Sequence, residues 1–313
     1  MPVLSRFSPA AITRLALANV VANGAIVVTG GVVRLTGSGL GCPTWPRCTD
    51  DSFVTTPEMA GHGLIEFGNR LLTFVLTAVA IAVLVAVWRS ARRDLRPLAV
   101  LTFLGIPVQA AIGGVTVLTG LNPWTVAVHF LVSTVLVAVS TVLWLRSREP
   151  GVGQPLLRRP LVLLTGGIAA VTAVVLALGT VVTGSGPHSG DLDESGRPSG
   201  GRMGFDPETV SQLHADVVFL LVGLTVALLV ALHATDAPGR VRRAARDLLV
   251  VQLLQGVIGF VQYFTHLPVV LVLLHMLGAV LVTVYTARLV WSVRGPATEQ
   301  PLDAPATQVP ATR

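Results

Sequence analysis

The stretch LLTFVLTAVAIAVLVAVW, residues 71–88, contains no charged side chain and decides the class of fold. A helix rises about 1.5 Å per residue, so about 20 apolar residues cross a hydrocarbon core of about 30 Å. Because backbone groups inside a bilayer must bond to one another, such a stretch predicts a membrane-spanning helix. We expect eight of them, near residues 13–33, 63–88, 97–119, 124–145, 159–182, 210–233, 246–265 and 269–293.

The composition agrees with an integral membrane protein. Of 313 residues, 52% are hydrophobic and 12% charged, and the mean hydropathy is +0.73. An average soluble domain has about 25% charged residues, so a soluble fold is excluded. The formal charge of +6 comes with 22 basic residues that are all Arg and lie mostly between the apolar runs. This placement indicates membrane topology and contact with lipid, and argues against a nucleic-acid partner.

The arginines also predict the orientation. Seventeen of the 22 fall on one side of the expected spans, which the positive-inside bias assigns to the cytoplasm. The protein is then expected in the cell (cytoplasmic) membrane with both termini in the cytoplasm. The long loops near residues 34–62 and 183–209 are expected on the outer side. The first span is interpreted as a retained helix, since no small-residue cleavage site follows it. Residues 295–313, rich in Pro, Ala and Thr, are expected to form a disordered cytoplasmic tail.

The two halves of the chain resemble each other. The sequence Thr-Gly-Ser-Gly at residues 36–39 recurs 147 residues later, and both Gln109 and His129 have counterparts 146 residues later. Four spans per repeat is an even number, so both repeats enter the membrane from the same side. The fold class is therefore expected to be all-α, with two tandem four-helix bundles related by a parallel pseudo-twofold axis, at residues 1–148 and 149–294.

Four histidines lie in the even-numbered spans: His62, His129, His214 and His275. Counted from the preceding prolines, all four are expected at about 8–11 Å below the outer helix ends. Ionisable groups inside a membrane suggest a functional site, and facing imidazoles on paired helices can bind haem iron. The alternative for any single one is a hydrogen-bonded packing residue. A non-haem metal site is disfavoured because carboxylates are scarce in the spans.

Cys42 and Cys48 lie in a short, proline-containing outer loop. On that side of the membrane a disulfide is expected. The pair serves either as a loop staple or as a redox-active pair beside the cofactor, and the sequence leaves both open.

Glu66 lies inside the second span, one turn before Arg70. A carboxylate there needs a partner, which Arg70 supplies in a purely structural interpretation. The functional interpretation is proton transfer at an oxidation site. Arg34 and Arg70 are also candidates for bidentate contacts with haem propionates.

Three segments together resemble the haem A synthase family: residues 26–39, the Cys-Pro-x-Trp-Pro-x-Cys loop at residues 42–48, and Ile-Glu-Phe-Gly-Asn-Arg at residues 65–70. The resemblance runs through all eight spans. It implies an oxidoreductase that oxidises the C8 methyl group of the substrate haem O to a formyl group, which yields haem A for cytochrome c oxidase. It further implies haem O synthase, a membrane farnesyltransferase, as the supplier of haem O; a homo-oligomer is also compatible with the sequence.

The resemblance also implies site residues. His214 and His275 would ligate a haem b cofactor in the C-terminal half, His129 would serve the haem O site in the N-terminal half, and Glu66 would be the catalytic carboxylate. The family pattern Glu-x-x-His-Arg has Asn69 at its His position here. Either His62 replaces the missing imidazole, or His129 alone holds the iron.

Two other functions are weighed against this one. A bis-histidine electron-transfer cytochrome b would favour two equivalent haem sites, and Asn69 breaks that symmetry. A multi-pass transporter would need buried charge or broken helices near the midplane, whereas the polar groups cluster toward the outer third of the spans.

Overall fold

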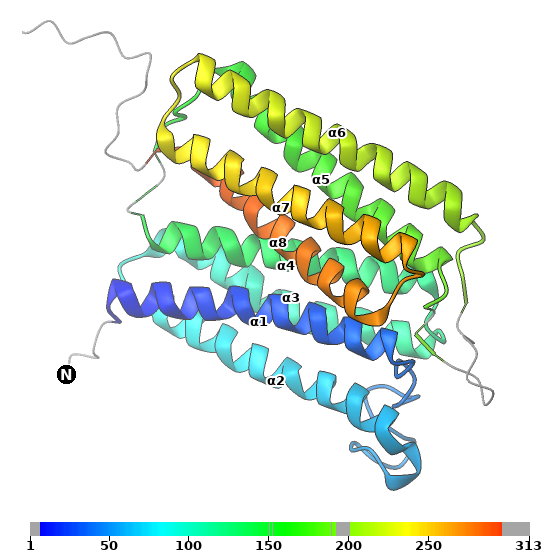
Figure 1. Ribbon diagram of the computed structural model, residues 1–313. Coiled ribbons are helices and arrows are strands. Elements are labelled where there is room, and N and C mark those ends of the chain that lie inside the picture. Colours follow the sequence, from blue (N-terminus) through cyan, green and yellow to red (C-terminus); the bar gives the residue numbers. More distant parts are fainter. Residues whose placement is uncertain (1–6, 150, 152, 189, 192–200, 296–313) are drawn as a thin grey trace, which may run out of the picture.

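The computed structural model describes residues 7–149, 151, 153–188, 190–191 and 201–295. Within them the chain is helical, and its β pairing is limited to two isolated bridges. The helices are α1 Pro9–Leu35, α2 Ala60–Trp88, α3 Arg96–Leu118, α4 Pro123–Ser147, α5 Arg159–Ser185, α6 Pro207–Ala234, α7 Gly239–Phe264 and α8 Val269–Ser292, with single turns of 3-10 helix at Pro57–Met59 and Arg93–Leu95. All eight α-helices are long and apolar enough to cross a membrane, so the fold is that of an all-α, multi-pass membrane protein (Figure 1). The expected tail lies outside the described residues, apart from Gly295.

The predicted spans are confirmed, and α7 shows the largest difference at its boundary. It begins at Gly239, whereas the apolar run begins near residue 246. The added turns carry arginines, which a search for apolar residues leaves out. One of them is paired at the helix end, where Arg240 Nη1 lies 3.1 Å from Glu149 Oε1; the next arginine along the helix, Arg246, pairs with Asp247.

The helices form two closed rings. Helix α1 contacts α2 and α4, and α3 contacts α2 and α4; α5 to α8 repeat this order. Among the described residues, α2 does not contact α4 and α6 does not contact α8, so the even-numbered helices face each other diagonally. Figure 1 shows α1–α4 on one side of the molecule and α5–α8 on the other. The rings share an interface, so their division into two independent bundles stays a prediction.

The shared interface depends on small residues of α1. A Cβ atom added at Gly31 would lie 2.5 Å from Met276 Sδ of α8, and one at Gly24 would lie 3.1 Å from a methyl group of Val280. Small residues let membrane helices approach closely, where van der Waals packing holds them together. Helices α4 and α5 complete this interface.

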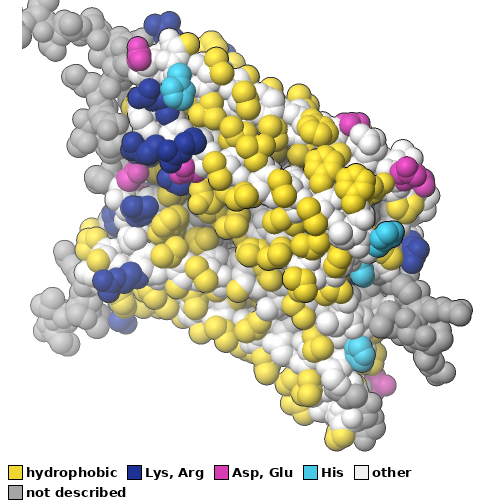
Figure 2. All heavy atoms as spheres, viewed as in Figure 1, with side chains coloured by type: hydrophobic (Ala, Val, Ile, Leu, Met, Phe, Trp, Pro, Cys, Tyr) yellow, Lys and Arg dark blue, Asp and Glu magenta, His cyan; other side chains and the backbone are white. Residues whose placement is uncertain are grey.

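The two ends of the molecule differ in chemistry. We call the end that carries the long connections after α1 and α5 the loop end, and the opposite end the arginine end. Figure 2 shows most of the visible Arg side chains gathered at the arginine end, hydrophobic side chains over the middle, and His and acidic side chains at both ends.

The densest apolar packing lies toward the arginine end. One buried cluster includes Ile12, Val87 and Leu143, and another includes Leu232 and Leu248. The candidate histidines His129, His214 and His275 lie beyond these clusters, toward the loop end. The structure therefore places its largest apolar clusters at the arginine end and these histidines nearer the loop end.

Candidate functional site

Three of the predicted histidines lie at a common depth. His129, His214 and His275 are six or seven residues into α4, α6 and α8, which places them about 9–11 Å from the first residue of each helix. His62 differs, because α2 begins at Ala60 and not at Pro57. Its Cα atom is about 3 Å into the helix, its side chain is exposed, and its Nδ1 bonds to Ser38 Oγ at 2.9 Å. The expectation of one depth for all four histidines is therefore wrong for His62.

Each of the three deeper imidazoles packs against a glycine of the preceding helix. A Cβ atom at Gly113, Gly179 or Gly259 would lie 3.2–3.3 Å from Cε1 of His129, His214 or His275, respectively. A side chain at these positions would displace the ring by a few tenths of an ångström or more. The sequence contained a signal for two of these partners, because Gly113 and Gly259 recur at the same offset as the histidines.

The backbone of two of these histidines is held by glutamine. Nε2 of Gln109 donates to the carbonyl of His129 at 2.9 Å, and Nε2 of Gln255 donates to the carbonyl of His275 at 2.7 Å. The repeat seen in the sequence is thus also a repeat of contacts between neighbouring helices.

His214 and His275 lie on α6 and α8, the two helices that face each other diagonally in the ring of α5–α8. The Nδ1 atoms of both, and that of His129, are buried and have no hydrogen-bond partner in the described part of the chain. Buried polar groups are normally paired, so imidazoles with an unpaired ring nitrogen on diagonal helices fit a metal-containing ligand between them. The donor set suits haem iron.

The fourth equivalent position holds Asn69 of α2. The hydroxyl of Thr29 on α1 donates to Asn69 Oδ1 at 2.7 Å. The Asn69 amide is thus hydrogen-bonded to α1, whereas the equivalent His214 packs against a glycine of α5. Thr29 carried no signal in the sequence.

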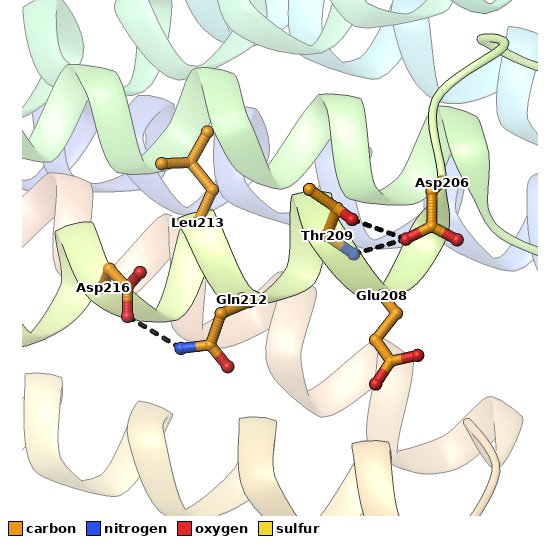
Figure 3. Close-up of a pocket in the computed structure, with 6 residues that line it drawn as sticks. All are labelled: Asp206, Glu208, Thr209, Gln212, Leu213 and Asp216. Carbon is orange, nitrogen blue, oxygen red and sulfur yellow. Dashed lines mark hydrogen bonds between the residues drawn. The ribbon is translucent and has the colours of Figure 1, made fainter.

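A shallow surface depression of about 510 Å³, lined by exposed side chains, lies at the loop end of α6 (Figure 3). It is lined by Asp206, Glu208, Thr209, Gln212, Leu213 and Asp216. None of the three imidazoles lines it, so it is separate from the histidine site. Asp206 caps α6 by accepting from the Thr209 N–H at 2.8 Å and the Thr209 hydroxyl at 2.7 Å, and these bonds lower the pKa of the Asp206 carboxyl.

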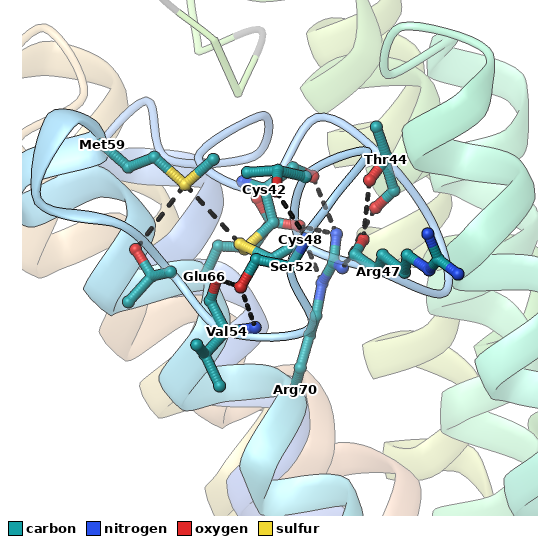
Figure 4. Close-up of a disulfide and its surroundings, with 11 residues drawn as sticks. Cys42, Thr44, Arg47, Cys48, Ser52, Val54, Met59, Glu66 and Arg70 are labelled. Carbon is teal, nitrogen blue, oxygen red and sulfur yellow. Dashed lines mark hydrogen bonds and ion pairs between the residues drawn. A yellow bond between two sulfur atoms is a disulfide. The ribbon is translucent and has the colours of Figure 1, made fainter.

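Glu66 and Arg70 attach the loop after α1 to α2 (Figure 4). Glu66 is 5% exposed; its Oε2 accepts from the Cys42 N–H at 2.5 Å, and its Oε1 accepts from Arg70 Nη2 at 2.6 Å. Arg70 also donates to the carbonyls of Cys42, Thr44 and Arg47 at 2.8–3.1 Å. The i,i+4 pair expected from the sequence is present, and the backbone of the cysteine loop binds to it.

Cys42 and Cys48 form a disulfide, as expected, with their Cα atoms 4.4 Å apart. Both are fully buried. Met59 Sδ lies 3.6 Å from Cys48 Sγ, and the ring of Trp45 lies against the backbone of Gly114 on α3. The loop therefore covers the loop-end surface of α2 and α3.

Arg34 joins the two loops. Its Nε donates to the carbonyl of His188 at 2.8 Å, and its Nη2 donates to the carbonyl of Thr183 at 3.0 Å. The N–H of Gly39 donates to the carbonyl of Gly190 at 2.9 Å beside these contacts. The two repeated Thr-Gly-Ser-Gly segments are therefore connected at the loop end.

The chain matches the model of the family COX15-CtaA, described as cytochrome oxidase assembly protein, over residues 13–287. The chain belongs to this family. The match covers every helix except the first residues of α1 and the last of α8.

Several named proteins are similar to the chain over shorter segments. Proteins named "Heme A synthase" from Listeria monocytogenes and Bacillus pumilus are 33% identical over 116 and 124 residues, which cover 36% and 38% of this chain and 38% and 39% of those proteins. A protein of the same name from Halalkalibacterium halodurans is 30% identical over 133 residues, 42% of this chain and 44% of that protein. The matched segments thus span less than half the length of these relatives.

Proposed function

We propose that the protein is a haem A synthase, which oxidises the C8 methyl group of haem O to a formyl group. The observation that carries this proposal is the set of three imidazoles at one depth, on α4, α6 and α8 of a COX15-CtaA family member, whose buried Nδ1 atoms have no hydrogen-bond partner in the described residues. Similar proteins that carry the name "Heme A synthase" support it.

The C-terminal half, residues 149–294, is proposed to hold haem b between His214 and His275. Both imidazoles are packed on glycine, and Gln255 holds the backbone of His275. The bound iron would supply redox chemistry; the protein fixes ring orientation and excludes water.

The N-terminal half, residues 1–148, is proposed to bind haem O next to His129. Glu66 lies on α2 close to one turn nearer the loop end than Asn69. A substrate bound at the level of His129 and Asn69 would therefore have the Glu66 carboxylate on its loop-end side. We assign to Glu66 the acceptance of a proton as the methyl group is oxidised. A carboxylate is suited to this task when it is buried and its partner Arg70 fixes its position.

The two arginines receive different roles. Arg70 uses Nε, Nη1 and Nη2 for protein acceptors, so we assign it to holding the cysteine loop. Arg34 donates through Nε and Nη2, and its Nη1 makes no hydrogen bond in the described residues. We propose that this remaining group contacts a propionate, a pairing that guanidinium geometry favours.

We further propose that the arginine end faces the cytoplasm and that the loop end lies outside the cell membrane. The excess of arginine at one end of the spans supports this orientation. The disulfide at the loop end agrees with an oxidising compartment.

The test is to purify the full chain in detergent, extract its porphyrins and separate them by chromatography. Haem B together with haem O or haem A is the expected result. Haem B alone would contradict the proposal in favour of an electron-transfer cytochrome, and a preparation without porphyrin would contradict any haem function.

A further inference from the structure

The four even-numbered helices each present one side chain to the preceding helix at the same level. Three of these side chains are imidazoles on glycine, and the fourth is the amide of Asn69. His214 and Asn69 are equivalent: the first lies on α6 against α5, and the second lies on α2 against α1. The Thr-Gly-Ser-Gly segments at the ends of α1 and α5 are 147 residues apart, so Gly179 of α5 corresponds to Val32 of α1. Thr29 lies three residues from Val32, within one helical turn.

The contact with Thr29 decides what Asn69 can do. Thr29 Oγ1 lies 2.7 Å from Asn69 Oδ1, so the amide oxygen is occupied and the amide is held against α1. The remaining group of Asn69 is its NH₂, a hydrogen-bond donor that cannot ligate a metal. The exposed His62 does not compensate, because it lies two turns nearer the loop end and is bonded to Ser38.

His129 therefore stands alone in its ring. Its imidazole is positioned by Gly113 and its backbone by Gln109, as for His275, but the diagonal partner has no ring nitrogen. In the C-terminal half the same two diagonal positions both carry an imidazole, His214 on α6 and His275 on α8.

We infer that the N-terminal site binds its haem through His129 alone, with an open iron face toward Asn69 that accepts a small diatomic ligand. Asn69 contributes a hydrogen-bond donor to that ligand, and Thr29 is the positioning residue that orients the amide. The inference rests on the proposed function and deepens it. It assigns the reactive haem to the N-terminal half, and it assigns a haem held by two histidines, with no free position on its iron, to the C-terminal half.

The experiment uses the full chain, reconstituted with haem until two haems are bound, and carbon monoxide as the probe. In the wild-type protein we expect about half of the ferrous haem to bind carbon monoxide, and we expect the ferric protein to give one high-spin and one low-spin signal in electron paramagnetic resonance. His129→Ala should remove the high-spin signal and leave the low-spin one. Asn69→His should convert the high-spin signal to low-spin and abolish carbon monoxide binding.

The role of Thr29 has its own readout. Asn69→Leu keeps the size of the side chain and removes the donor, so the C–O stretching frequency of the bound ligand should rise. Thr29→Val should shift that frequency in the same direction without changing the spin state. An unchanged frequency in both variants would overturn the assignment of Asn69 as donor.

The outcomes separate this inference from the proposed function. A wild-type protein that makes haem A but shows only low-spin haem and binds no carbon monoxide would overturn the inference alone. Carbon monoxide binding that survives Asn69→His would also overturn it. A protein with the expected spectra that never forms haem A would instead contradict the proposed function.

Discussion

The imidazole of His275 lies against the backbone of Gly259, where a Cβ atom would come within 3.2 Å of the ring carbon Cε1. The same relationship recurs between His129 and Gly113 and, with 3.3 Å, between His214 and Gly179. Side-chain orientation at such a site is set by the surrounding shell, because an imidazole on a helix otherwise rotates among rotamers. Glycine on the odd-numbered helices is therefore a structural requirement of the histidine site.

Replacing Gly259 by Val should displace the His275 ring and weaken haem binding by about 10- to 100-fold, the range found for residues that orient metal ligands. The matched control is Gly256→Val on the same helix, where no atom lies within 4 Å of an added Cβ. Haem content per protein, measured from the pyridine haemochrome, checks this. Equal loss in both variants would show that the glycine contact is unimportant.

His275→Ala should abolish the haem b absorbance, because it removes one of the two imidazoles that we propose hold the haem. His266→Ala, a change of an exposed histidine in the α7–α8 connection, is the control and should retain the full absorbance. Optical spectra of the purified proteins decide this, and an unchanged spectrum for His275→Ala would defeat the assignment.

Glu66→Gln should leave haem b bound but lower haem A formation by about 10²- to 10⁴-fold, the usual contribution of a positioned proton acceptor. The glutamine oxygen can still accept from Arg70, which keeps its bonds to the loop carbonyls, whereas the amide nitrogen cannot replace the oxygen that accepts from the Cys42 N–H. Glu208→Gln, on the exposed surface of α6, is the control. Chromatography of extracted porphyrins measures the yield, and normal haem A in Glu66→Gln would remove this residue from the mechanism.

Arg70→Ala should make the buried disulfide accessible to reductant, because three loop carbonyls lose their charged donor. A hydrogen bond to a charged group contributes about 1.5–3 kcal/mol, so we expect reduction and thiol alkylation to accelerate about 10-fold or more. Arg202→Ala, at an exposed position near the other end of the second loop, should have no effect. Mass spectrometry of the alkylated protein provides the rates; identical rates in both variants would contradict the loop-holding role.

The N-cap of α6 predicts a dependence of stability on pH. Hydrogen bonds from Thr209 lower the pKa of Asp206 in the folded protein, so Asp206 contributes stability above its unfolded pKa of about 3.9. This contribution is lost as the pH falls through the lower folded pKa. Asp206→Asn should reduce the loss of thermal stability between neutral and acidic pH, whereas Asp236→Asn, beyond the other end of α6, should not. Unfolding midpoints in detergent measure both, and equal slopes would contradict the prediction.

Local patterns in the sequence were sufficient to predict the eight helices and to select the candidate histidines of the even-numbered spans. Apolar runs predicted eight spans, and the constant offset of residues such as Gln109 and His129 predicted two repeats, whose contacts the structure then showed to be equivalent. These patterns misplaced His62, because the residues Pro57–Met59 form a 3-10 turn, so the α-helix starts later than the proline suggested. Start signals of helices are less exact than their apolar cores.

Hydropathy and repeat spacing thus determined that this chain crosses the membrane eight times with imidazoles on the even-numbered spans, since burial in lipid constrains each helix by its own composition. Only the tertiary structure decided that Asn69 bonds to Thr29, that Glu66 and Arg70 bind the backbone of the cysteine loop, and that Arg34 reaches the second loop. These contacts join residues as much as 154 positions apart, and they depend on how helices rotate and pack against each other. A periodicity read along one helix carries no information about that rotation.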